Sequence, residues 1–171
     1  MYQNRWALVT GASAGIGKAY ADALMDKGAN LILVARRADR LQALADKAEV
    51  KGLQALTVPM DLSEPEAPKK IMAAVEAAGV PVDILVNNAG YGLPGTYSET
   101  QWADQRDFIQ VMVTAYAHLT HLALVPMKER GWGRIINVAS LAGIIPAGAN
   151  YTLYGASKAF VIAMTQSVAA E

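Results

Sequence analysis

The sequence Thr10-Gly11-Ala12-Ser13-Ala14-Gly15-Ile16-Gly17 decides the fold, because it joins an apolar run at residues 5–10 to a helical pattern. The apolar run ends at a glycine, as a buried parallel strand does before a tight turn. Glycines in such a turn let the backbone approach a pyrophosphate, and the following helix offers free N–H groups to phosphate oxygens. The pattern predicts a dinucleotide-binding loop with contacts from Gly11, Ser13, Gly15, Ile16 and Gly17; the alternative is a plain glycine turn.

Strand-like and helix-like segments alternate along the chain beyond this loop. Helical patterns separate further apolar, strand-like runs at residues 31–35, 53–60, 82–86 and 134–138. Such alternation is typical of a parallel sheet with helices on both faces. We therefore predict an α/β fold with a doubly wound, Rossmann-like parallel sheet, in which residues 1–171 form a single dinucleotide-binding domain.

The same patterns predict helix faces and ends. Ser63 with Glu66 predicts a capping box for the third helix, and Pro126 predicts a kink or the last turn of the long helix. The last helix begins near Thr152 and reaches Glu171 with no cap, glycine or proline, so we expect a fragment or a natural chain that continues. The first helix is expected to turn one stripe to the sheet, formed by Ile16, Ala19, Tyr20, Ala23 and Leu24.

Composition excludes several classes of function. Basic and acidic residues number 15 each in 171 residues, so no overall charge draws the chain to nucleic acid or to an anionic membrane. The absence of cysteine excludes disulfides, thiolate nucleophiles and zinc-thiolate sites. His118 and His121 have no acidic or histidine partner at metal-ligand spacing, so we expect no metal site. We also expect no signal peptide, no membrane span and a cytoplasmic location.

The end of the second strand bears on the choice of cofactor. A site selective for NAD(H) needs an acidic residue about 20 positions after the glycine loop, to hold the ribose 2′-hydroxyl. Here the strand ends in Ala35-Arg36-Arg37. A guanidinium suits a 2′-phosphate and can lie against adenine. Arg36 and Arg37 therefore favour NADP(H) over NAD(H); the alternative is a pair of solvated arginines.

A tyrosine and a lysine stand one helical turn apart in Tyr154-Gly155-Ala156-Ser157-Lys158. On a helix this spacing places both side chains on one face. A fixed ammonium near a phenol favours the phenolate, which makes the tyrosine a candidate for proton exchange. Tyr151 is a second candidate, but Gly155 stands at its i+4 position, so we expect Tyr151 to line a pocket instead.

Together these motifs resemble the short-chain dehydrogenases/reductases, and the resemblance covers residues 5–171. The spacing Thr-Gly-x-x-x-Gly-x-Gly is similar to the cofactor loop of that family. Asp61-Leu62 resembles its adenine contact, and Asn87-Asn88-Ala89-Gly90 is similar to the signature that supports the sheet beside the cofactor. The family's catalytic triad is matched by Ser140, Tyr154 and Lys158.

The resemblance implies a reaction and a role for each residue of that triad. Tyr154 would act as the general acid in carbonyl reduction and as the base in alcohol oxidation. Lys158 would bind the nicotinamide ribose and favour the phenolate, and Ser140 would donate to the substrate oxygen. The cofactor would supply the hydride. The implied partners are a carbonyl or alcohol small molecule and further copies of the chain, in a homodimer or homotetramer that pairs helices such as the one with Leu119, Leu122 and Ala123.

Two departures from the family pattern bear on activity. The family usually has an asparagine in the long helix that holds a water relay to the lysine, and the matching residue here is Met112. A thioether cannot replace an amide in a proton relay, so we expect a rerouted relay or slower turnover, with Thr114 as a substitute if the register differs. Further strands and a substrate lid follow the last helix in the family, so we expect that this domain lacks its C-terminal strands.

The sequence favours an NADP(H)-dependent oxidoreductase that interconverts a ketone or aldehyde and the corresponding alcohol. Two alternatives remain open: a catalytically weak or inactive dinucleotide-binding regulatory protein, and an inert fragment of a longer reductase. The complete triad argues against the regulator, whereas Met112 and the short C-terminus argue for it. An apolar or aromatic-tolerant substrate is indicated by the loop residues Leu93, Leu141, Ile144 and Ile145.

Overall fold

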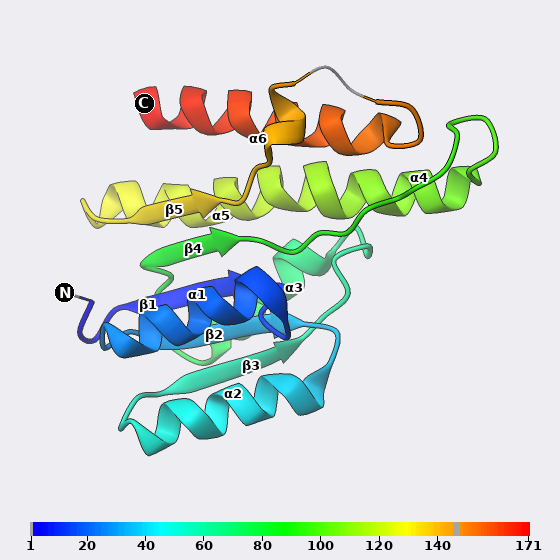
Figure 1. Ribbon diagram of the computed structural model, residues 1–171. Helices are drawn as coiled ribbons and strands as arrows, with labels where there is room; N and C mark the ends of the chain where they lie inside the picture. The colour runs from blue at the N-terminus through cyan, green and yellow to red at the C-terminus, as the bar shows by residue number, and fades with distance from the viewer. Residues whose placement is uncertain (1, 146–147) are drawn as a thin grey trace.

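The computed structural model of the chain describes residues 2–145 and 148–171. Figure 1 shows strands and helices in alternation, and the predicted strands are all present with ends shifted by at most two residues. In chain order the elements are β1 (Trp6–Thr10), α1 (Gly15–Asp26), β2 (Asn30–Ala35), α2 (Ala38–Val50), β3 (Ala55–Pro59), α3 (Ala67–Ala77), β4 (Ile84–Asn87), α4 (Trp102–Ile109), the π-helical turn η1 (Gln110–Thr114), α5 (Ala115–Glu129), β5 (Arg134–Asn137), the 3-10 turn η2 (Leu141–Gly143) and α6 (Thr152–Ala170).

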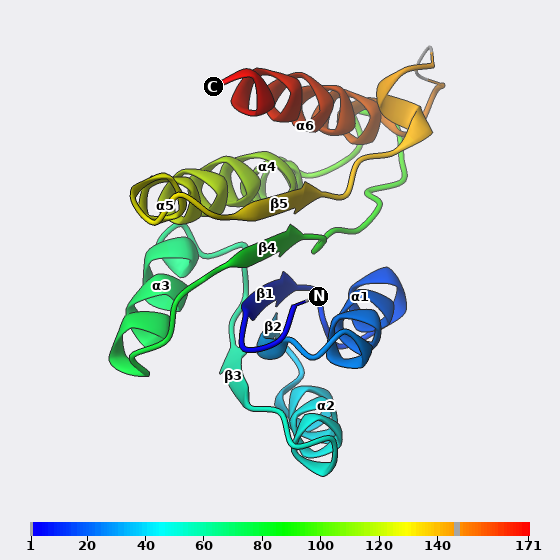
Figure 2. The ribbon, with the colours of Figure 1, turned by 90° about the vertical axis from the view of Figure 1, so that its left-hand side faces the viewer.

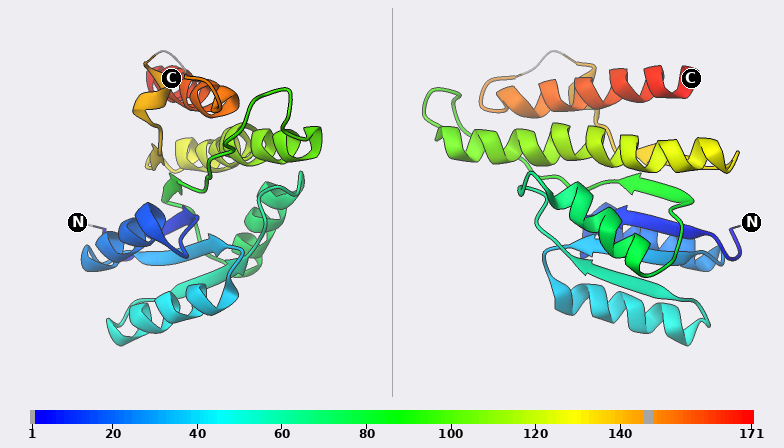
Figure 3. Two further views of the ribbon diagram at one scale, coloured as in Figure 1. Left: turned by 45° about the vertical axis from the view of Figure 1, so that its right-hand side comes forward. Right: turned by 180° about the vertical axis from the view of Figure 1, so that it is seen from behind.

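The sheet is parallel throughout, with the strand order β3-β2-β1-β4-β5. Helices α1 and α2 cover one face, and α3 with the long α4–α5 helix covers the other (Figure 2). Helix α6 runs alongside α4–α5 at the β5 end of the sheet (Figure 3). The predicted doubly wound fold is confirmed. Its strand order reverses between β1 and β4, which makes this pair the topological switch point. In open parallel sheets, ligands generally bind at the switch point, outside the carboxyl ends of the strands.

A hydrophobic core lies on each face of the sheet. Successive strand residues point to opposite faces, so Leu8 joins the core beneath α3 and the long helix, whereas Val9 joins the core beneath α1 and α2. Every residue of β1 is buried. This is why the central strand is apolar without alternation, as strands covered on both faces are.

The predicted sheet-facing stripe of α1 is correct at Leu24, which is buried, and at Tyr20, which is half-buried and packs against the core, and it is wrong at the other three residues. The helix exposes Ile16, Ala19 and Ala23 and instead buries Gly17, Ala21, Leu24 and Met25. The reason is the glycine loop, because a Cβ at position 17 would stand 2.4 Å from the carbonyl oxygen of Gly11. The need for a small residue at this contact sets the rotation of the helix.

The predicted capping box of α3 is also wrong. The helix begins at Ala67 after Glu66, and no side chain caps it. Ser63 lies before the helix, where its backbone N–H donates to Oδ1 of Asp61 at 3.0 Å. Pro65 accounts for the later start, since a proline disfavours helical conformation in the residue before it.

The helical stretch from Trp102 to Glu129 is continuous through η1. This stretch is long and apolar enough to cross a membrane by those two criteria alone. The core helices of soluble proteins meet the same two criteria. Pro126 lies in its last turn, as one of the two predicted options had it. Leu119 and Ala123 are each 1% exposed within the chain. These two residues therefore belong to the core and do not offer a surface for a second copy.

Candidate functional site

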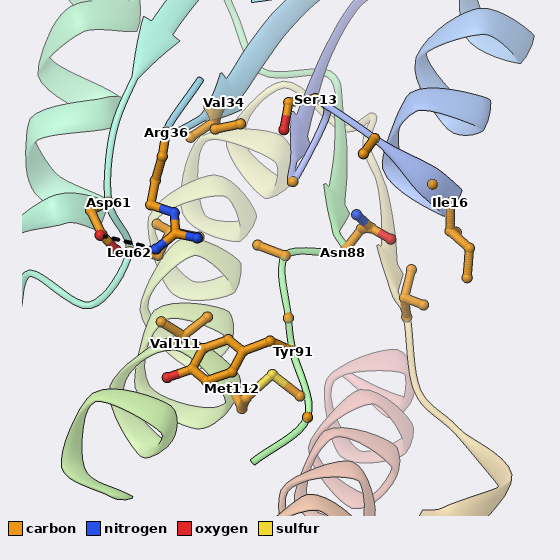
Figure 4. A pocket seen from close by; sticks show the side chains of 18 of the residues that line it. Ser13, Ile16, Val34, Arg36, Asp61, Leu62, Asn88, Tyr91, Val111 and Met112 are labelled. Atoms are coloured by element: carbon orange, nitrogen blue, oxygen red, sulfur yellow. Dashed lines mark ion pairs between the residues drawn. The ribbon is translucent and has the colours of Figure 1, made fainter. Parts of the chain in front are cut away.

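A cavity of about 730 Å³ lies at the carboxyl ends of β1, β2 and β4 (Figure 4). Most of the predicted site residues line it, namely Gly11, Ser13, Gly15, Ile16, Arg36, Arg37, Asp61, Leu62, Asn88, Ala89, Gly90, Tyr154 and Lys158. Two predicted residues do not: Gly17 is buried against the glycine loop, and Ser140 lies beyond the end of β5. The structure thus brings together motifs that are separated by more than a hundred residues in the sequence.

Thr10 joins the glycine loop to the segment after β4. Its hydroxyl donates to the carbonyl of Val86 at 3.3 Å and accepts from the N–H groups of Asn88 and Ala89 at 2.9 and 3.0 Å. In return, the side-chain amide of Asn88 donates to the carbonyl of Thr10 at 2.9 Å. Gly11 follows with a φ of +67°, and a Cβ there would meet Asn88 at 2.8 Å. Glycine is therefore required at this position on two grounds.

Two arginines stand at the end of β2, beside the glycine loop. Arg37 donates from Nε and Nη2 to the hydroxyl of Ser13 at 3.2 and 2.9 Å. Arg36 lies 3.7 Å from Asp61 and is 77% exposed along its side chain, so its guanidinium remains accessible (Figure 4). Burial acts to raise the pKa of Asp61, but hydrogen bonds from Ser63 and the charge of Arg36 outweigh it and lower the pKa.

Tyr154 and Lys158 meet at the opposite end of the cavity. Lys158 is 4% exposed, and its Nζ donates to the carbonyl of Val138 at 2.7 Å. The ammonium lies 5.9 Å from the ring centroid of Tyr154. Burial lowers the pKa of Lys158. The predicted pairing of these side chains on one face of α6 is thus present in the structure.

Ser140 ends the segment after β5 and caps η2. Its hydroxyl accepts from the N–H of Ala142 at 3.2 Å. A smaller cavity of about 420 Å³ lies beside η2 and is lined by Ala142, Tyr151 and Tyr154, among others. Tyr154 therefore borders both cavities, whereas no hydrogen bond joins Ser140 to Tyr154 in the part of the chain that the structure describes.

A chain of polar side chains fixes α6 to the sheet. Asn87 on β4 donates to Thr120 of α5 at 3.1 Å and to Asn137 of β5 at 2.9 Å. Asn137 in turn donates to Thr165 of α6 at 2.9 Å. At the other end of α6, a Cβ on Gly143 would stand 2.6 Å from the backbone carbon of Lys158. The helix that carries Tyr154 and Lys158 is therefore held at two points.

Met112, which the resemblance matches to the family's relay asparagine, lies at the large cavity. It is 1% exposed, lines the large cavity and falls within η1. Its sulfur packs on Gly90, where a Cβ would meet it at 2.8 Å. Thr114 is exposed and does not line the cavity, so its hydroxyl is not placed to substitute for a relay group there.

Sequence reasoning missed Tyr116. This residue of α5 is 1% exposed, and its ring centroid lies 5.3 Å from Nζ of Lys158. Its i+4 spacing from Met112 was the available signal, because that spacing places both residues on one helix face.

The cavity fits an elongated anionic ligand. One cationic end is formed by the two arginines that follow β2. The other is the ammonium of Lys158, which is bound to the carbonyl of Val138 just after β5. Three strand spacings of about 4.8 Å, or roughly 14 Å, separate β2 from β5 and so the two ends. Between them lies the glycine loop, where a Cβ on Gly15 would meet no atom within 4 Å. No group of three or more His, Cys, Asp or Glu side chains within residues 2–145 and 148–171 could hold a metal ion.

The chain matches the short chain dehydrogenase family over residues 5–171. It is 38% identical to a short chain dehydrogenase of Pseudocercospora fijiensis, covering 99% of this chain and 55% of that protein. It is 34% identical to a ketoacyl reductase of Nostoc sp., covering 96% of this chain and 57% of that protein. L-sorbose reductase from Gluconobacter frateurii, solved with NADPH and L-sorbose, superposes with a TM-score of 0.90 at 32% identity, over 99% of this chain and 64% of the reductase.

Replacing Thr10 by valine is expected to lower the free energy of unfolding by about 1–3 kcal/mol. The variant keeps the shape of the side chain but leaves the N–H groups of Asn88 and Ala89 without their acceptor. Urea unfolding measures the change. Thr57→Val is the matched control, because Thr57 also lies on a strand but its hydroxyl makes no hydrogen bond in the described residues. Equal losses in the two variants would show that the Thr10 hydroxyl has no special role.

The stability of the chain is expected to depend on pH through Lys158. Burial lowers its pKa in the folded state, so between that pKa and the unfolded value of about 10.4 the unfolded chain binds more protons. The free energy of unfolding should therefore rise with pH across this window, relative to that of Lys158→Met. Urea unfolding at several pH values measures the difference, with the exposed Lys128→Met as the control for a lost charge. A difference that does not vary with pH would contradict the prediction.

Proposed function

The chain belongs to the short chain dehydrogenase family, whose members use a nicotinamide dinucleotide, and from this we infer that it is an NADP(H)-dependent oxidoreductase that interconverts a ketone or aldehyde and its alcohol. The observation that carries this proposal is the cavity with two cationic ends, since Tyr154 and Lys158 stand at one end and Arg36 and Arg37 at the other. The chain spans 55% and 57% of the two relatives described above, so the activity of a whole protein is part of the proposal.

Each residue near α6 has a defined task in the proposed reaction. The bound nicotinamide supplies the hydride to the carbonyl carbon. Tyr154 gives its hydroxyl proton to the carbonyl oxygen and takes one back when the alcohol is oxidised. The ammonium of Lys158 favours the resulting phenolate, and two of its three N–H groups remain for the ribose hydroxyls, because the third is directed to Val138. Ser140 donates to the substrate oxygen as negative charge develops there.

NADP(H) is proposed over NAD(H) because of the groups at the end of β2. Arg36 and Arg37 stand where an NAD-selective site would need an acidic side chain. Ser13 holds the guanidinium of Arg37 beside the glycine loop. Such a fork suits a 2′-phosphate, and Asp61-Leu62 would contact the adenine. The related L-sorbose reductase was solved with NADPH, which supports the same preference.

The substrate is proposed to be an apolar or aromatic carbonyl compound. The smaller cavity beside Tyr154 is lined by Ala142, Ile145 and the ring of Tyr151. Leu141 and Ile144 are also exposed near it, at 75% and 72%. Apolar side chains around a small number of polar groups favour apolar substrates. Leu93 is packed against the core and does not contribute.

Cytoplasmic location and homodimeric or homotetrameric assembly are also proposed. The balanced charge and the lack of cysteine support the location. The assembly rests on membership in the family alone, because Leu119 and Ala123 are buried inside the chain.

A dinucleotide-binding regulatory protein is the second candidate. Met112 favours it, since its buried thioether lines the cavity where a proton relay would need a polar group. The third candidate, an inert fragment, would neither bind NADPH nor consume it with a carbonyl substrate. Binding and turnover therefore have to be measured separately.

Consumption of NADPH over a panel of ketones and aldehydes tests the proposed reaction. Tyr154→Phe is expected to lower kcat by about 10²–10⁴-fold, because it removes the proton donor, and to leave the Kd for NADPH unchanged. Tyr151→Phe is the matched control and should keep its activity. Binding without consumption would indicate the regulatory protein, and the absence of both would indicate the fragment.

The ratio of Kd values for NADH and NADPH tests the cofactor preference. Arg36→Ala with Arg37→Ala is expected to weaken NADPH binding by about 10- to 100-fold, because charged hydrogen bonds to the 2′-phosphate are lost. NADH binding should hardly change. Arg40→Ala, an exposed arginine of α2 outside the cavity, serves as the control. Equal losses for both nucleotides would contradict the assignment.

A further inference from the structure

Lys158 is a buried cation without an acidic partner. It is 4% exposed, and it takes part in no salt bridge within residues 2–145 and 148–171. Among the described residues, its ammonium donates a hydrogen bond only to the neutral carbonyl of Val138, at 2.7 Å. Removing an ammonium from water is costly unless other groups stabilise the charge. Part of that stabilisation must come from the surfaces that pack around Nζ.

Two aromatic rings face the ammonium. Nζ lies 5.3 Å from the ring centroid of Tyr116 on α5 and 5.9 Å from that of Tyr154 on its own helix. Both distances fall within the range of about 6 Å at which a ring face attracts a cation. In the part of the chain that the structure describes, these two phenols are the titratable groups that face Nζ. The segment after β5 offers it the backbone carbonyl of Val138, and Gly143 of η2 lies against the helix backbone at Lys158.

The hydroxyl of Tyr116 does not anchor this side chain. Tyr116 is 1% exposed, and its hydroxyl is buried without a hydrogen-bond partner among the described residues. Burial raises the pKa of Tyr116 and the neighbouring Tyr154 adds to the rise, so the phenol stays neutral and provides no anionic charge. The favourable electrostatic contact of this side chain is therefore the one between its ring and Lys158.

We propose that Tyr116 is a positioning residue whose ring face takes the place of a carboxylate in holding the Lys158 ammonium beside Tyr154. A carboxylate would accept hydrogen bonds from the ammonium and so occupy its donors. A ring face attracts the charge as a whole, so the N–H groups that are not directed to Val138 stay available to a ligand. The proposal rests on the proposed function only in one respect, namely that the ammonium favours the phenolate of Tyr154 during the reaction.

The titration of Lys158 tests the proposal without cofactor or substrate. Carbon NMR of protein labelled with [ε-13C]lysine follows the ionisation, and Lys158→Met identifies the resonance. Tyr116→Leu is expected to lower the titration midpoint by about 0.5–1.5 pH units, because loss of the ring removes an attraction to the charged form. Tyr116→Phe keeps the ring and should keep the midpoint. Tyr116→Met is a second non-aromatic variant, in case leucine prevents folding.

Phe108→Leu is the matched control for loss of a buried aromatic ring. Phe108 is fully buried in the neighbouring α4 and packs edge-on with Tyr91 at 5.4 Å, and its replacement should leave the Lys158 midpoint unchanged. An unchanged midpoint in Tyr116→Leu and Tyr116→Met would overturn the proposal. So would a drop in Tyr116→Phe as large as that in Tyr116→Leu, since the hydroxyl would then hold the charge.

The pH dependence of NADPH consumption gives a second readout. The upper limb of the kcat profile is expected to move to lower pH in Tyr116→Leu and to return in Tyr116→Phe. If no variant and no wild-type protein turns over, the proposed reaction fails but the NMR titration still decides the role of Tyr116. A further outcome is turnover in which the Lys158 titration midpoint shifts in Tyr116→Leu while the upper limb of the kcat profile stays in place. In that case the ring holds the charge, but the positioning role toward Tyr154 is overturned.

Discussion

The hydroxyl of Thr10 is the contact on which the cavity depends. Its three hydrogen bonds reach Val86, Asn88 and Ala89, so one side chain ties the end of β1 to the end of β4 across the switch point. The same contact leaves no room for a Cβ at Gly11. The glycine loop and the segment after β4 therefore form one rigid wall, and their backbone groups can face a ligand together.

A second constraint is the position of α6 relative to that wall. Polar side chains on β4, β5 and α6 form a hydrogen-bonded chain through Asn87, Asn137 and Thr165, and Gly143 lets η2 touch the helix backbone. These contacts hold Lys158 in a buried place where its pKa is lowered. The arrangement costs stability, because it removes a charge from water. Strongly perturbed pKa values of buried groups cluster at functional sites.

Much of the fold could be predicted from the sequence, because apolar runs and glycine positions report local structure directly. The site could be predicted where spacing along one element decides it, as for Tyr154 and Lys158. Prediction failed at the rotation of α1, because the contact between Gly17 and Gly11 forms only in the folded chain. It also failed at the start of α3, where the local effect of Pro65 outweighs the capping pattern of Ser63 and Glu66. Tyr116 was missed because its spacing from Met112 shows only that the two residues share a helix face, whereas the fold of the chain brings its ring to the ammonium.

We propose that a dinucleotide lies across the carboxyl edge of the sheet, with its nicotinamide end at Tyr154 and its adenosine end at Arg36 and Arg37. A crystal structure with bound NADP⁺ tests this most directly. The expected result places the nicotinamide ribose within hydrogen-bond distance of Lys158 Nζ and the 2′-phosphate at one of the two guanidinium groups. A dinucleotide bound in the reverse direction, or outside this cavity, would contradict the account.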